Sequence, residues 1–211
     1  MSKKIVVDAG HGGTDSGAVG NGIIEKDLTL KISQYIFNRL KELGADVYIT
    51  RDTDETITPT DRVNRVKNAF GNSSDVVVIS NHINAGGGDG AEVIYALRNN
   101  DALSKLILSE LEKEGQNIRR AYQRRLPSDN TKDYYFMQRN TGNTESVTVE
   151  YGFLDSKGDD VNQLKNNWQN LAEGVVRAVS EYAGIPYNTN GNSENTYTVV
   201  SGDTLFMGNN E

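Results

Sequence analysis

The sequence predicts an α/β fold of three layers, in which a mostly parallel or mixed sheet of about six strands carries helices on both faces. Short runs rich in Val, Ile and Tyr alternate along the chain with longer segments of helical hydrophobic spacing. Some of the short runs are almost continuously apolar, which is typical of strands buried on both faces. The 211 residues, of which 36% are apolar, suffice for one full core but not comfortably for two.

The expected elements follow from these two periodicities. Strands are expected at residues 4–8, 46–50, 75–80, 91–97 and 146–150, with 134–138 as a further candidate. Helices are expected where apolar side chains recur every three or four residues, in segments that begin near Leu28, Val63, Leu103 and Val161. Gly44 gives the first helix a C-terminal stop, and the last segment is expected to form one long helix to Tyr182.

The chain has two histidines, and each closes a strand-like apolar run. Neutral imidazole is the commonest protein ligand for zinc, and open α/β sheets place reactive groups at the C-terminal ends of their strands. His11 and His82 are therefore candidate metal ligands. A catalytic zinc keeps three protein ligands, and because the chain has no cysteine, the third is expected to be a carboxylate. Glu25, at the expected start of the first helix, is the best candidate.

Four separated segments resemble the zinc-dependent N-acetylmuramoyl-L-alanine amidases (amidase type 3) of bacterial autolysins and phage endolysins. The segments are residues 5–13 with His11, 25–28 with Glu25, 80–85 with His82, and 147–154 with Glu150. Their order matches the family over roughly residues 3–184. The resemblance implies that Zn²⁺ is bound by the two histidines and Glu25 and that Glu150 is the catalytic carboxylate. The chain departs from the family at Asn81, where an apolar residue is more usual.

Amide hydrolysis explains why such residues are needed. Zinc lowers the pKa of a bound water toward about 7 and polarises a carbonyl, while a neighbouring carboxylate takes a proton and later delivers it to the departing nitrogen. We expect Glu150 to do this, with its pKa raised by burial at the end of a strand. Asn84 and Gly152 are candidate substrate contacts. Asp8 has two open interpretations: it orients an imidazole, or it caps nearby backbone.

The resemblance implies a peptidoglycan hydrolase that cleaves the amide bond between N-acetylmuramic acid and L-alanine. The expected partner is bacterial peptidoglycan. One alternative is a zinc peptidase acting on the stem peptide, because the same site would serve any amide. Another is a catalytically inactive wall-binding domain, although the retention of all four chemical residues argues against it.

Three parts are expected along the chain. Residues 1–184 form the catalytic domain, residues 185–196 form a flexible polar linker, and residues 197–211 form a disordered, truncated remnant of a LysM glycan-binding module. Residues 197–205 resemble the first strand and turn of that module. The N-terminus carries two lysines but few apolar residues before Asp8, so no signal peptide is expected. This suits a phage endolysin made in the host cytoplasm and acting on the wall after release. If the natural protein carries a signal peptide ahead of the residues given, the expectation is instead secretion.

Charge sets further limits on partners. The net charge of −7 argues against nucleic-acid binding, which requires clustered cations. No apolar run is long enough to span a membrane, and we expect a monomer. One basic run, formed by Arg119, Arg120, Arg124 and Arg125, has two open interpretations: a solvated face, or contact with anionic parts of a wall polymer.

Overall fold

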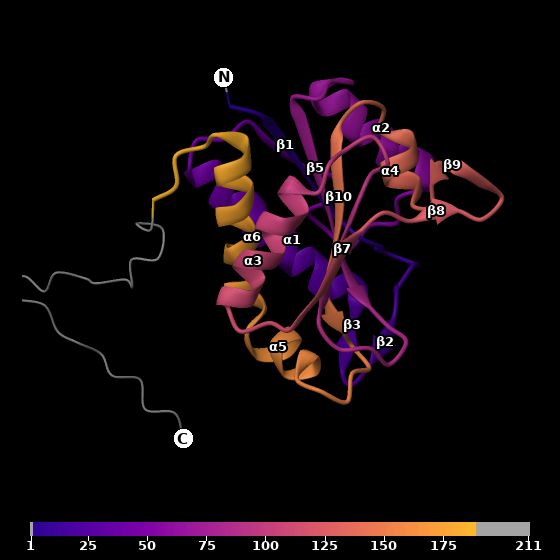
Figure 1. Ribbon diagram of the computed structural model, residues 1–211, viewed down its shortest axis with the longest axis vertical. Helices are drawn as coiled ribbons and strands as arrows, with labels where there is room; N and C mark the ends of the chain where they lie inside the picture. The colour runs from indigo at the N-terminus through magenta and orange to yellow at the C-terminus, as the bar shows by residue number, and fades with distance from the viewer. Residues whose placement is uncertain (1, 189–211) are drawn as a thin grey trace, which may run out of the picture.

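The computed structural model describes residues 2–188 and has a six-stranded mixed sheet with helices on both faces (Figure 1), which confirms the predicted fold class. In spatial order the strands are β4 (Val47–Ile49), β1 (Lys4–Ala9), β5 (Val76–Asn84), β10 (Glu145–Phe153), β6 (Ala91–Tyr95) and β7 (Ile118–Tyr122). Strand β6 runs antiparallel to β10, and the other neighbours pair in parallel. Two small hairpins stand apart from the sheet: β2 (Val19–Gly20) with β3 (Ile23–Ile24), and β8 (Arg125–Leu126) with β9 (Asp129–Asp133).

The helices divide between the two faces of the sheet (Figure 1). Helices α1 (Glu25–Glu42), α3 (Ala102–Lys113) and α6 (Trp168–Ala183) cover the larger core, and α5 (Asp160–Asn166) leads into α6. Helices α2 (Pro59–Phe70) and α4 (Phe136–Asn140) cover the smaller core on the opposite face. Val77 and Ile79 of β5 face the larger core, while Val76 and Val78 face the smaller one. The alternation of side chains along each strand thus fills both cores.

Parallel pairing brings the C-terminal ends of β1, β5 and β10 to one edge of the domain. In the register of the sheet, His82 of β5 lies opposite Glu150 of β10, and Glu150 lies opposite Glu92 of β6. Glu92 in turn lies opposite Arg120 of β7. Residues opposite one another in neighbouring strands point to the same face. His82, Glu150, Glu92 and Arg120 therefore form a row across four adjacent strands, called here the cross-strand row.

The sixth strand is not the one expected. The candidate strand at residues 134–138 is wrong, because α4 begins at Phe136 and the Gln138 side-chain amide donates to the Ile94 carbonyl at 2.7 Å. The sixth strand of the sheet is instead β7, which lies at the edge next to β6. Its alternation is hidden in the sequence because Arg119 and Arg120 are adjacent at a register shift and both contact Glu92.

The C-terminal segment also differs from expectation. The long helix is divided into α5 and α6 at Asn167, whose side-chain amide donates to the Glu114 carbonyl at 2.8 Å. The expected linker begins later than residue 185, because Ile185 is buried and the Tyr187 hydroxyl donates to Glu173 at 2.7 Å. Residues 189–196 of that linker and the predicted LysM-like remnant lie outside the described residues. Among residues 2–188, no helix combines the length and the apolar character that crossing a bilayer requires.

Candidate metal centre and active site

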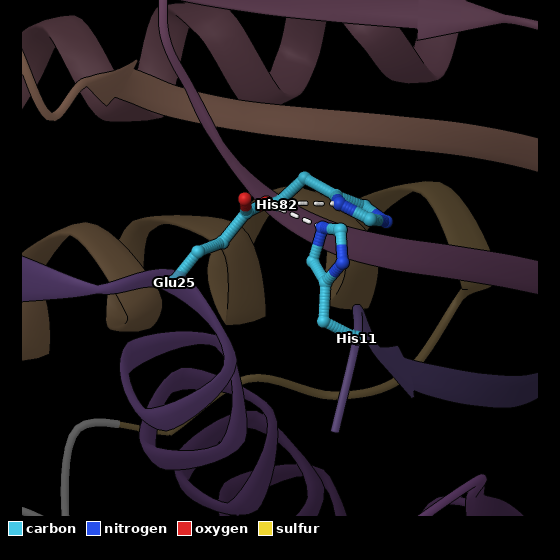
Figure 2. Close-up of side chains that lie close together, drawn as sticks. All are labelled: His11, Glu25 and His82. Carbon is cyan, nitrogen blue, oxygen red and sulfur yellow. Dashed lines mark hydrogen bonds and ion pairs between the residues drawn. The ribbon is translucent and has the colours of Figure 1, made fainter. Parts of the chain in front are cut away.

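His11, Glu25 and His82 point toward one another from three different elements (Figure 2). They come from the turn after β1, the first residue of α1, and β5. Glu25 Oε1 lies 3.0 Å from His11 Nε2 and 3.1 Å from His82 Nδ1, and the potential ligand atoms all lie within 4.8 Å of one another. Two imidazoles and one carboxylate are a donor set of catalytic zinc sites, with a fourth position left for water. The three residues therefore fit a zinc ion.

The Glu25 carboxylate is fixed by the backbone on both of its oxygens. The Ile83 amide donates to Oε1 at 3.0 Å, and the Ala18 amide donates to Oε2 at 2.8 Å. Burial alone would raise the pKa of Glu25, but the hydrogen bonds from His11 and His82 outweigh burial and hold that pKa well below its usual range. The carboxylate is therefore ionised, as a metal ligand must be.

The His11 ring is oriented by Asp15, four residues later. His11 Nδ1 lies 2.9 Å from Asp15 Oδ2, which leaves Nε2 to face Glu25. A carboxylate on the second ring nitrogen is the usual way in which a metal-binding histidine is held in one tautomer. His11 also has a φ of 61°, an uncommon conformation for a side chain of this size. Asp15 is a functional residue that our sequence reasoning left without a role, although its spacing from His11 was visible.

Two glycines make room for this packing. A Cβ at Gly10 would lie 2.4 Å from the His82 ring, so the end of β1 can pass His82 only as glycine. A Cβ at Gly17 would lie 2.6 Å from Glu25 Oε2 and 2.7 Å from the His11 ring, and its φ of 62° is left-handed. The Gly-rich loop is therefore required by the close approach of the three side chains.

Two buried arginines hold the backbone that carries His11. Arg62 of α2 donates to the Ala9 carbonyl and, at 2.6 Å, to the His11 carbonyl. Arg51 donates to the Ala9 carbonyl at 3.1 Å and to the Gly10 carbonyl at 2.8 Å. Neither arginine was predicted to belong to the site, because their roles depend on chain segments more than forty residues away.

Asp8 anchors this arrangement, and neither interpretation from the sequence describes it. Its carboxylate accepts hydrogen bonds from Arg62 at 2.8 Å and from the hydroxyls of Thr50 and Ser80, each at 2.6 Å. Burial by itself raises the pKa of Asp8, but Arg62 and the two hydroxyls lower it below its ordinary value. Asp8 thus acts on His11 indirectly, by holding Arg62 in place.

Glu150 lies beside His82 in the cross-strand row. Its side chain is buried, and its Oε2 atom has no hydrogen-bond partner among residues 2–188. Burial raises the pKa of Glu150 to about 7, against the opposing effect of His82. A carboxyl group that titrates near neutral pH is suited to accept a proton and return it. The unpartnered oxygen faces the same side of the sheet as His82.

The two candidate substrate contacts, Asn84 and Gly152, have different surroundings. Asn84 lies on the same face as His82, two residues further along β5, and its amide donates to Glu92 Oε2 at 3.3 Å. Gly152 is buried, and a Cβ there would meet Gln116 Nε2 at 2.7 Å and Asp160 Cγ at 2.8 Å. The close approach at Gly152 is therefore made by the protein's own side chains, and its assignment as a substrate contact stays a prediction.

A small cavity opens beside the two imidazoles. Its volume is about 120 Å³. Phe136 and Met137 of α4 line it together with Pro59 of α2, and Arg62 lies at its wall. The side chains of the smaller core thus give the site an apolar flank.

A three-layer α/β domain with a His–Glu–His group and a buried glutamate next to it has the features of a metal-dependent hydrolase. Comparison with known proteins identifies the family. Residues 5–181 match the family model Amidase_3, described as N-acetylmuramoyl-L-alanine amidase, and the chain belongs to that family.

Relatives and solved structures agree with this assignment. The chain is 30% identical over 200 residues to the germination-specific N-acetylmuramoyl-L-alanine amidase of Bacillus subtilis, covering 86% of this chain and 81% of the relative. It is 31% identical over 202 residues to the endolysin of Bacillus phage SPP1, covering 92% and 70%. The amidase AmiC2 of Nostoc punctiforme superposes with a TM-score of 0.71 at 26% identity, covering 85% of this chain and 96% of that one.

Proposed function

We propose that the protein is a zinc-dependent peptidoglycan amidase that hydrolyses the bond between the lactyl group of N-acetylmuramic acid and L-alanine. The observation that carries the proposal is the His11–Glu25–His82 group with the buried, unpartnered Glu150 carboxylate in the adjacent strand. Membership of the amidase family supports the choice of substrate.

The mechanism assigns a task to each residue. His11, Glu25 and His82 would hold a zinc ion, which when bound would supply a Lewis acid for activating water and polarising the substrate carbonyl. Asp15 keeps Nε2 of His11 directed toward Glu25, and Arg62 and Arg51 hold the backbone of residues 9–11 in place. Glu150 takes the proton from the attacking water and then gives it to the alanine nitrogen as the amide bond breaks.

The experiment is digestion of purified peptidoglycan, followed by mass spectrometry of the released fragments. We expect new N-terminal alanine and intact muramic acid, lost after chelation and restored by added zinc. Cleavage between stem residues would replace the proposal with a zinc peptidase. No release under any condition, with a folded and metal-loaded protein, would favour the inactive wall-binding domain.

We further propose a lytic role in a phage infection, in which the enzyme is made in the host cytoplasm and reaches the wall after release. The likeness to the endolysin of phage SPP1 over 92% of this chain supports this role. The test is the addition of purified protein to permeabilised and intact bacteria. Rapid loss of turbidity at low enzyme concentration is expected of an endolysin, and slow trimming of the wall without lysis would contradict it.

A further inference from the structure

The basic run lies in and just after β7, at the end of the cross-strand row that is remote from His82. Arg119 and Arg120 of β7 both contact Glu92 Oε1, at 2.9 Å and 3.1 Å. Glu92 is buried, whereas the Arg120 side chain is 57% exposed. One carboxylate therefore holds two guanidinium groups at the surface, and positive charge remains in excess there.

A third guanidinium, that of Arg124, is stacked on an aromatic ring, as that of Arg120 is. Arg120 lies 4.1 Å from the centre of the Tyr122 ring, and Arg124 lies 3.8 Å from the centre of the Tyr134 ring. Arg124 also donates to the Tyr135 hydroxyl at 3.4 Å, and it forms no ion pair with a carboxylate in the part of the chain that the structure describes. Stacking on aromatic rings orients a guanidinium without neutralising it.

These rings connect the arginines to the active site. Tyr135 is half-buried, and after burial the charge of Glu150 is the next cause that raises its pKa. Burial, Tyr135 and then Glu92 raise the pKa of Tyr122 to about 12. Tyr122 and Tyr135 thus lie in the same electrostatic environment as Glu92 and Glu150, on the side of the sheet that carries the cross-strand row.

The spacing of the row sets the length of a ligand. Arg120 is three strands away from His82, and strands lie about 4.8 Å apart, so the two backbones are separated by about 14 Å. An extended peptide spans about 3.3 Å per residue. An acidic group about three to four residues beyond an amide at His82 and Glu150 would therefore reach the arginines.

We infer that Arg120 and Arg124 bind a carboxylate of the stem peptide and so determine which muramyl peptides are cut. This inference rests on the proposed amidase function. The glycan side of the scissile bond is built of uncharged N-acetyl sugars, whereas the peptide side carries carboxylates, some of which bacteria convert to carboxamides. The peptide side therefore complements the cationic end of the row, and a planar guanidinium suits a carboxylate.

The test compares a soluble muramyl pentapeptide with the same compound in which every peptide carboxylate is a carboxamide. We expect Arg120→Gln and Arg124→Gln each to raise KM for the acidic compound about tenfold, with kcat changed less than twofold. KM for the amidated compound should change little. The matched control is Arg125→Gln, because Arg125 donates to the Asn130 carbonyl within the β8–β9 hairpin. An equal rise of KM for both compounds would overturn the inference.

A guanidinium also binds phosphate, so the phosphates of anionic wall polymers are a second possible source of the anionic ligand. Sacculi with and without these polymers distinguish the two sources. If the arginine variants lose activity only on phosphate-bearing sacculi and are normal on the soluble acidic peptide, the carboxylate assignment is wrong.

A binding measurement that does not depend on cleavage tests this inference separately from the proposed function. In a Glu150→Gln background, calorimetry with the acidic peptide should give a dissociation constant that Arg120→Gln raises about tenfold. If the wild-type enzyme releases no alanine terminus but this binding difference is present, the amidase proposal fails while the carboxylate site stands. If cleavage occurs and the binding difference is absent, the carboxylate site fails alone.

Discussion

The two ends of the cross-strand row are built in opposite ways. Around His82 the charged groups are met by protein partners: Glu25 is fixed by two backbone amides, and buried Arg62 is paired with buried Asp8. Around Arg120 two guanidiniums share one carboxylate and are largely open to water. A closed, hydrogen-bonded shell fixes atoms to the tolerance that chemistry needs, whereas exposed arginines keep charge free for a ligand. Glu150 lies between these two environments.

The largest expected effect is the fall in turnover when the Glu150 carboxyl group is removed. Glu150→Gln should lower turnover about 10³-fold, within the usual range for a general acid–base, while zinc content and unfolding temperature remain those of the wild type. The matched control is Glu145→Gln, a buried glutamate at the opposite end of β10, which should retain turnover. Turnover of Glu150→Gln within tenfold of the wild type would remove Glu150 from the mechanism.

The end of the row at His82, called here the closed end, should be sensitive to the loss of the buried Arg62–Asp8 ion pair. Arg62→Met leaves the Asp8 carboxylate buried without its cation, so we expect the free energy of unfolding to fall by about 3–5 kcal/mol in urea titrations. Arg65 lies on the same helix in a half-exposed pair with Glu55, and Arg65→Gln should cost no more than about 1 kcal/mol. Equal losses in the two variants would mean that the closed end is not held by the Arg62 pair.

The orientation of His11 should affect metal binding more than the fold. Asp15→Asn removes the carboxylate at His11 Nδ1, and loss of such a partner lowers metal affinity about 10- to 100-fold. Competition with a chromogenic zinc chelator measures the change. Asp27→Asn, which alters an exposed residue in the first turn of α1, serves as the control and should leave affinity unchanged.

The smallest expected effect is a pH dependence of stability at the closed end. The pKa of Asp8 is lowered in the folded protein from its ordinary value of 3.8, so its contribution is complete above that value and is lost as the pH falls toward the folded pKa. The difference in unfolding free energy between the wild type and Asp8→Asn should therefore be constant near pH 6 and shrink below pH 3.8. A difference that stays constant to pH 2.5 would contradict the assignment of an ionised, paired Asp8.

Sequence reasoning found the residues whose signal is local. His11 and His82 are scarce residues at apolar runs, and Glu25 begins a helix whose hydrophobic face is plain in the sequence. It did not find β7, because two adjacent arginines hide the alternation, nor the helix at residues 136–140, because an aromatic run favours a strand. The packing of Gln116 and Asp160 against Gly152 could not be foreseen, because a glycine does not reveal which neighbour fills the space beside it.

The sequence by itself determined the α/β class, the strands at the centre of the sheet and the three residues that fit a metal, because periodicity and residue chemistry are properties of short segments. Tertiary structure alone decided that Arg62, Arg51 and Asp8 hold the His11 backbone and that Arg120 lies in line with Glu150. These relations depend on strand order and register. Register is set by how all layers pack together, so no short segment contains it.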